Sequence, residues 1–208
     1  MRKVFIYWDN SNIYHEAQRL ARELEEADSP GAYYRLRVDF EQLYRLARAD
    51  REVEAALAAG SVPPEMRQLW HRLENQGVQV ELFDRGLKGE QNMPDKVLQL
   101  RMLEDALDYN GTPGIVVLLI GDGAGYYQGS GFHRTLERMH VRKWQVEILS
   151  WRHACNKRMR EWAEMHGKFI ALDDFYDSIT FLNPSREGFE LALPRNAKPL
   201  DLTKRDHF

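Results

Sequence analysis

The chain has 208 residues, of which 43% are hydrophobic, so it can bury the core of a single domain. Its formal net charge of −3 excludes a strongly basic nucleic-acid coat, although 29 Lys and Arg residues leave room for a local basic patch. The single cysteine, Cys155, excludes an intrachain disulfide and a Cys-based zinc site. Since no apolar run approaches the roughly 20 residues that cross a bilayer, we expect a cytoplasmic protein that does not enter the membrane.

Hydrophobic periodicity predicts strands and helices that alternate along the chain. In chain order we expect a strand at 3–8, helices at 13–27 and 40–49, an ambiguous segment at 53–59, a helix at 65–76, a strand at 78–83, a helix at 95–109, a strand at 115–120, a helix at 132–139, a strand at 144–149, a helix at 156–165 and a strand at 169–172. The alanines of 53–59 favour a helix, whereas its short length and the stop that follows suit a strand. Asp39 is expected to cap the helix that begins at Phe40.

This alternation is typical of an α/β protein, and we expect a three-layer sandwich with a mostly parallel central sheet. The periodic pattern ends near Asn183-Pro184, where the sequence becomes polar. We therefore expect one domain over residues 1–183 and a C-terminal tail over residues 184–208.

Two of the most apolar segments end on a carboxylate. The run Val4–Trp8 is followed by Asp9, and the run Ile115–Ile120 is followed by Gly121-Asp122-Gly123. Open α/β sheets bind ligands at the carboxyl ends of their strands, and clustered carboxylates suit hard cations such as Mg²⁺ or Mn²⁺. The pair Asp9 and Asp122 therefore indicates a metal site.

Each carboxylate also has a purely structural interpretation. Asp9 could cap the first helix, although Asn10, Ser11 and Asn12 could each do so, and Asp122 could be a turn residue between glycines. Asp95 begins a helix, where the macrodipole favours an acid in any case. Asp105, about 280° around that helix from Asp95, is expected on a solvated face.

The chain resembles the NYN domains, a branch of the PIN-like nuclease superfamily that includes the LabA-like proteins. The matching segments are residues 6–12 (IYWDNSN), Lys88-Gly89 with the later Asp95, residues 119–123 (LIGDG), and the stretches 146–151 and 169–173. They extend over nearly everything from Met1 to about Leu182.

The resemblance implies a function and a set of site residues. In this family, carboxylates at these strand ends bind Mg²⁺ or Mn²⁺ for hydrolysis of RNA phosphodiester bonds. Asp9, Asp95 and Asp122 would be the metal ligands here, and Asn12 would hold the site or the scissile phosphate in place. Ser11, Lys88 and Gly123 would contact the substrate. The resemblance thereby raises Asp95 from a structural residue to a site candidate.

The chain departs from the family pattern at two acidic positions, which are Arg101 and Ala124 here. Glu104 or Asp105 could compensate. These departures keep open a second hypothesis. In it the chain is a catalytically weakened NYN domain that acts as an RNA- or protein-binding regulatory module and does not cleave RNA. A third hypothesis is a small-molecule phosphotransfer or phosphohydrolase enzyme. Such enzymes usually have Asp-x-Asp after the first strand, and in this chain the second of these positions is Ser11. A homodimer is also left open.

Basic residues are frequent between residues 134 and 160. Such a run is usually a solvated face, but it could also form a basic stripe that an RNA backbone follows. Its members are Arg134, Arg138, Arg142, Lys143, Arg152, Lys157, Arg158 and Arg160.

Overall fold

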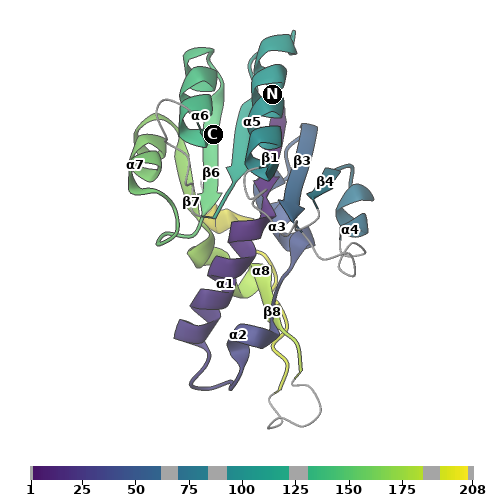
Figure 1. Cartoon of the computed structure of the whole chain (residues 1–208), viewed down its shortest axis with the longest axis vertical. Coiled ribbons are helices and arrows are strands. Elements are labelled where there is room, and N and C mark those ends of the chain that lie inside the picture. Colours follow the sequence, from purple (N-terminus) through teal and green to yellow (C-terminus); the bar gives the residue numbers. More distant parts are fainter. Residues whose placement is uncertain (1, 62–69, 84–92, 122–130, 185–192, 206–208) are drawn as a thin grey trace.

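The computed structural model describes residues 2–61, 70–83, 93–121, 131–184 and 193–205. Within these residues a six-stranded sheet has the order β4-β3-β1-β5-β6-β7, and every pairing in it is parallel. The strands are β1 (Val4–Asp9), β3 (Val53–Ser61), β4 (Gln79–Phe83), β5 (Ile115–Leu119), β6 (Gln145–Ser150) and β7 (Lys168–Ala171). The predicted α/β fold with a mostly parallel central sheet is confirmed (Figure 1).

The two central strands explain why the sheet is parallel and covered on both faces. Every residue of β1 and β5 is buried, which is the pattern of strands that are packed on both sides. One face is covered by α5 (Met93–Asp108), α6 (Phe132–Val141) and α7 (Lys157–His166). The other faces α3 (Phe40–Arg48), the first turns of α1 (Asn10–Leu24) and the short helix α8 (Tyr176–Ile179).

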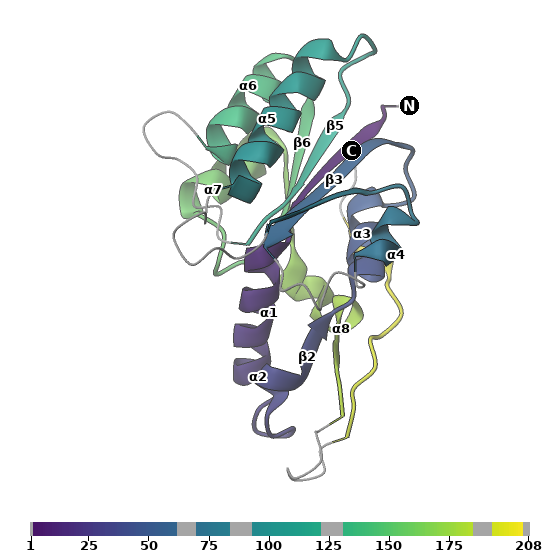
Figure 2. The same ribbon diagram turned by 45° about the vertical axis from the view of Figure 1, so that its right-hand side comes forward.

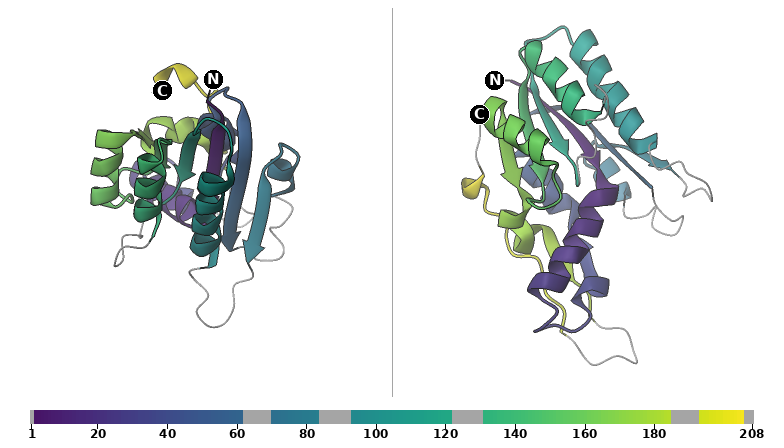
Figure 3. Two further views of the ribbon diagram at one scale, coloured as in Figure 1. Left: turned by 90° about the horizontal axis from the view of Figure 1, so that it is seen from above. Right: turned by 60° about the vertical axis from the view of Figure 1, so that its left-hand side comes forward.

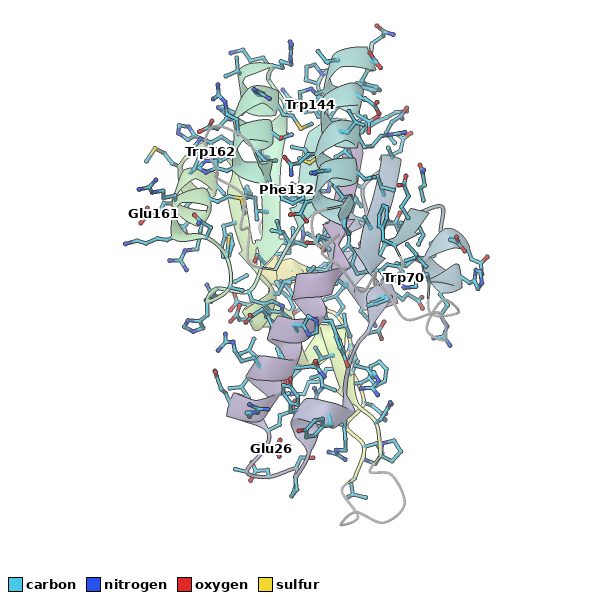
Figure 4. The ribbon with its side chains drawn as sticks, in the orientation of Figure 1. Glu26, Trp70, Phe132, Trp144, Glu161 and Trp162 are labelled. Atoms are coloured by element: carbon cyan, nitrogen blue, oxygen red, sulfur yellow. The ribbon has the colours of Figure 1, made fainter. Side chains whose placement is uncertain are left out.

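Aromatic side chains fill both layers between the helices and the sheet. Phe5 packs edge-on against Trp144 beneath α5 and α6, and Trp8 packs edge-on against Phe40 on the opposite face. Figure 4 marks Trp144 and Phe132, both of them buried, beside these helices. Large rings bury much apolar area, so these contacts hold the layers together.

A smaller unit extends beyond the carboxyl ends of the strands (Figures 1 and 2). It contains most of α1, the short helix α2 (Ala32–Arg35), and an antiparallel pair made of β2 (Leu36–Val38) and β8 (Thr180–Leu182). The sequence pattern missed both strands, because each has three residues and pairs with a segment far away in the chain. The right-hand view of Figure 3 shows α1 leading from the sheet into this unit.

Two local expectations have clear outcomes. The ambiguous segment is strand β3, because pairing with β1 and β4 on its two sides overrides the helix propensity of its alanines. Asp39 caps α3 as expected, since its carboxylate accepts a hydrogen bond from the backbone N–H of Gln42 at 3.1 Å. The helix expected at 65–76 is described only in part, as α4 (His71–Glu74), because residues 62–69 lie outside the described ranges.

The described part of the expected tail, residues 193–205, is packed on the domain. Arg195 forms a bridge with Leu182 and its guanidinium donates to Glu25, with Nε 2.8 Å from Oε2. Arg205 is buried against Glu147 of β6. The domain boundary near residue 183 stays a prediction, but this segment is not a loose appendage. No helix in the ranges given above has the length and apolar character that crossing a membrane requires.

Candidate active site

Asp9 is the last residue of β1, and α1 begins at the next residue without an intervening loop. Its side chain is only 3% exposed. In the parallel register Asp9 pairs with Ala59, which belongs to the core beneath α5, so Asp9 lies on the α5 side of the sheet. The central strand thus ends on a buried carboxylate that faces a helix.

Asp95 lies at the same edge of the sheet and on the same face. It is in the first turn of α5, three residues before Leu98 and seven before Met102, and both of these are fully buried against the sheet. This spacing places Asp95 on the sheet-facing side of α5, where it is partly buried. The structure therefore brings Asp9 and Asp95 to one edge and one face.

The remaining predicted site residues are described only through the backbone or not at all. Ser11 and Asn12 are in the first turn of α1, but their side chains lie outside what the structure describes. Lys88, Asp122 and Gly123 fall in the undescribed ranges 84–92 and 122–130. Among the described residues no three His, Cys, Asp or Glu side chains form a group able to hold a metal ion. The expected set of three carboxylates depends on Asp122.

The backbone of Ile120 and Gly121, which precede Asp122, is nevertheless fixed by hydrogen bonds to the end of β6. The carbonyl oxygen of Gly121 accepts a buried hydrogen bond from Ser150 Oγ at 2.7 Å, and the Ile120 N–H donates to the Leu149 carbonyl. On the opposite face of the sheet, the indole N–H of Trp151, which follows β6, donates to the Ile13 carbonyl at 3.0 Å. These contacts fix the end of β5 and the start of α1 against β6.

Asp105 was expected on a solvated face of α5, and this expectation is wrong. Its carboxylate accepts a hydrogen bond from the buried Tyr7 hydroxyl at 2.7 Å and another from Arg101 Nε at 3.1 Å, and its side chain is 16% exposed. Burial raises the pKa of the Tyr7 hydroxyl, and the Asp105 charge raises it further, so this hydroxyl remains a donor. A buried strand tyrosine needs a partner for its hydroxyl, which is the signal that could have identified this contact.

The Tyr7–Asp105 hydrogen bond also bears on the missing acidic positions. Asp105 is ten residues beyond Asp95, which corresponds to about 15 Å along the helix. It is held by Tyr7 and Arg101, so it does not replace the acid absent at Arg101. Glu104 is exposed and does not lie on the sheet-facing stripe of Leu98 and Met102. Neither residue therefore lies beside Asp95 on the sheet-facing side with a carboxylate free of other partners.

We expect the Tyr7→Phe substitution to lower the free energy of unfolding by about 2 kcal/mol, because it removes a hydrogen bond from a buried hydroxyl to a partly buried carboxylate. Urea unfolding followed by circular dichroism measures this change. Tyr34→Phe is the matched control, since Tyr34 is 73% exposed and its substitution should change little. Equal stability of the two variants would mean that the Tyr7–Asp105 contact does not hold α5 on β1.

Half of the eight basic residues between 134 and 160 form ion pairs with acidic neighbours. Ion pairs join Arg134 to Glu137, Arg152 to Asp174, Lys157 to Glu161 and Arg160 to Glu164. They are distributed over α6, the turn after β6, and α7. The basic residues are therefore spread over separate elements and partly balanced by carboxylates.

A parallel α/β sheet whose central strand ends on a buried carboxylate defines a class of proteins that bind ligands at the carboxyl edge of the sheet. Within this class, residues 3–173 match the family model of the NYN domain, and the chain belongs to that family of PIN-like nucleases. The match confirms the resemblance in the sequence motifs. Searches of curated proteins and of solved structures each returned no match.

Proposed function

We propose that this chain is a metal-dependent endoribonuclease that hydrolyses RNA phosphodiester bonds. The observation that carries the proposal is the position of Asp9, a buried carboxylate at the end of the central strand, on the same edge and face as Asp95. Membership of a PIN-like nuclease family supports a nuclease or RNA-related function in general.

The donor set suits a hard divalent cation. Asp9 and Asp95 offer carboxylate oxygens, which Mg²⁺ and Mn²⁺ prefer, and Asp122 would supply a third carboxylate from the end of β5. A bound ion would lower the pKa of the attacking water and screen the charge that develops on the phosphate. We assign Asp9, Asp95 and Asp122 to hold it.

The chain's own residues would bind and orient the RNA. The amino terminus of α1 lies at this edge, and the dipole of a helix favours an anionic phosphate at that end. Asn12, in the first turn of α1, would orient the scissile phosphate, and Ser11, Lys88 and Gly123 would contact the substrate. Helix α5 also begins at this edge, so the dipoles of α1 and α5 both favour negative charge there.

One observation favours a second candidate, a weakened domain that binds RNA or protein without turnover. Arg101 stands where the family often has an acid, and it is paired with Asp105. At this position α5 therefore carries a guanidinium, and the Asp105 carboxylate one turn further on is bound to Tyr7 and Arg101. A site with few carboxylates could hold one ion but has little capacity for a second.

Incubating the purified protein with single-stranded RNA and Mn²⁺ or Mg²⁺ distinguishes these two functions. The proposal expects cleavage that stops on addition of EDTA and returns when the metal is restored in excess. Salt-dependent RNA binding without cleavage would support the binding domain instead. RNA that is neither cut nor bound, together with no metal binding by calorimetry, would overturn the nuclease proposal.

A further inference from the structure

One side of α1 carries a row of aromatic and polar side chains. Tyr14, Gln18 and Arg22 follow one another at intervals of four residues, which places them on the same side of the helix. The Gln18 amide donates to the Tyr14 hydroxyl at 3.1 Å, and the rings of Tyr14 and His15 are 5.9 Å apart. His15 and Arg22 are exposed, and Tyr14 is half-buried. Ser11, in the first turn of α1, is three residues before Tyr14, so the row begins at the candidate active site.

Helix α2 continues this row with two tyrosines. The Gln18 amide also donates to the carbonyl oxygen of Tyr33 at 3.1 Å, and the Arg22 guanidinium lies 4.2 Å from the centre of the Tyr33 ring. Tyr34 packs edge-on against Tyr33, with 5.0 Å between the ring centroids, and is 73% exposed. The partly exposed Arg37 donates to the Tyr34 carbonyl at 3.0 Å. Figure 2 shows α2 beside the end of α1 that is far from the sheet.

The carboxylates nearby in the chain are held by other groups. Both acids of α1, Glu16 and Glu23, pair with Arg19, at 2.7 and 2.6 Å. Glu26 accepts hydrogen bonds from two backbone N–H groups around the start of α2, at 2.8 and 3.3 Å. Among the described residues Arg22 forms no ion pair, so its charge is available to a ligand.

We propose that this surface, made of Tyr14, His15, Arg22, Tyr33 and Tyr34, binds single-stranded RNA that extends from the candidate active site. The inference rests on the proposed RNA function. Exposed aromatic rings combined with guanidinium groups are typical of single-strand binding, because unpaired bases stack on the rings and the cations contact the backbone. A base would stack on Tyr34, and Arg22 would contact a phosphate.

The shape of the surface also suits a strand. From Ser11 to Arg22 it extends about 16 Å along the axis of α1, and α2 lengthens it further. It is continuous with the amino terminus of α1, where the helix dipole favours a phosphate. The cut RNA would therefore need several unpaired nucleotides on one side of the cleaved bond.

Fluorescence anisotropy with a labelled single-stranded RNA tests the stacking. The titration is done in EDTA, so that no metal-dependent cleavage occurs. Tyr34→Ala should raise the dissociation constant at least about fivefold, because one stack between a base and a ring is lost. Tyr34→Phe is the matched control, since it keeps the ring and should keep the affinity. The side chain is largely exposed, so both variants should fold.

The salt dependence of the same binding tests the cation. Arg22→Gln should make the slope of log affinity against log salt shallower by about 0.7, the value for one phosphate contact on a single strand. Arg48→Gln is the control and should leave the slope unchanged. Arg48 ends α3 shortly before β3 begins, so it lies toward the amino edge of the sheet, and it is 46% exposed.

A fully paired RNA of the same length is the second probe. Its bases are stacked within the duplex, so Tyr34→Ala should leave its binding unchanged. The proposal would be overturned by a wild type that does not bind the single strand, by Tyr34→Ala binding it like wild type, by an equal loss in Tyr34→Phe, or by equal slopes for Arg22→Gln and Arg48→Gln. Cleavage by wild type alongside such a result would leave the nuclease proposal standing. Binding that depends on Tyr34 without any cleavage would support this surface and contradict the nuclease.

Discussion

Replacing Asp9 by Asn is expected to abolish metal-dependent RNA cleavage while preserving the fold. The amide has the shape of the carboxylate but no charge, so it binds a divalent cation poorly. We expect a loss of at least about a hundredfold in cleavage rate, equivalent to about 3 kcal/mol of transition-state stabilisation. Initial rates on a defined RNA with saturating Mn²⁺ measure the effect.

The stability of the Asp9→Asn protein should equal or exceed that of the wild type. Asp9 is 3% exposed, and a neutral amide is less costly to bury than a carboxylate. Functional sites commonly carry such a stability cost. Asp39→Asn is the control for the same chemical change. Asparagine also caps helices, and Asp39 begins α3, which lies on the face of the sheet opposite to Asp9. Wild-type cleavage by Asp9→Asn would remove the observation on which the nuclease proposal rests.

Replacing Arg205 by Met is expected to destabilise the whole domain by about 3 kcal/mol. Glu147, on β6, has a fully buried side chain that accepts two hydrogen bonds from Arg51, each of 2.8 Å, and one from Arg205 at 2.6 Å. Burial by itself would raise the pKa of Glu147, but the two guanidinium groups outweigh it and lower that pKa. Without Arg205 the buried Glu147 carboxylate keeps only the hydrogen bonds from Arg51, so part of its negative charge is no longer balanced.

The pH dependence of this effect has a definite sign. Because the pKa of folded Glu147 lies below its usual value of 4.5, its contribution is full above that pH and is lost as pH falls through the folded pKa. The stability difference between wild type and Arg205→Met should therefore shrink in acid. Urea unfolding at neutral and acidic pH measures it, with Lys204→Met as the exposed neighbouring control. Equal unfolding of Arg205→Met and Lys204→Met would show that residues 193–205 lie outside the cooperative core.

The sequence by itself determined the parts of the fold that depend on local patterns. The apolar runs of β1 and β5, the cap at Asp39 and the alternation of helices with strands are properties of neighbouring residues, and each was confirmed. The same patterns identified Asp9 as a candidate, since strand ends can be read from periodicity, whereas Asp95 became a candidate only through the resemblance to the NYN family.

Tertiary structure decided what depends on distant partners. The alanines of β3 form a strand because β1 and β4 pair with it, and β2 exists because β8 returns to it from the end of the domain. Asp105 is tied to Tyr7, and Arg205 is buried on Glu147, through contacts between residues that are 98 and 58 positions apart. The common face of Asp9 and Asp95 follows from the packing of α5 on β1. Periodicity specifies which side of an element is apolar, whereas only packing specifies which other element covers that side.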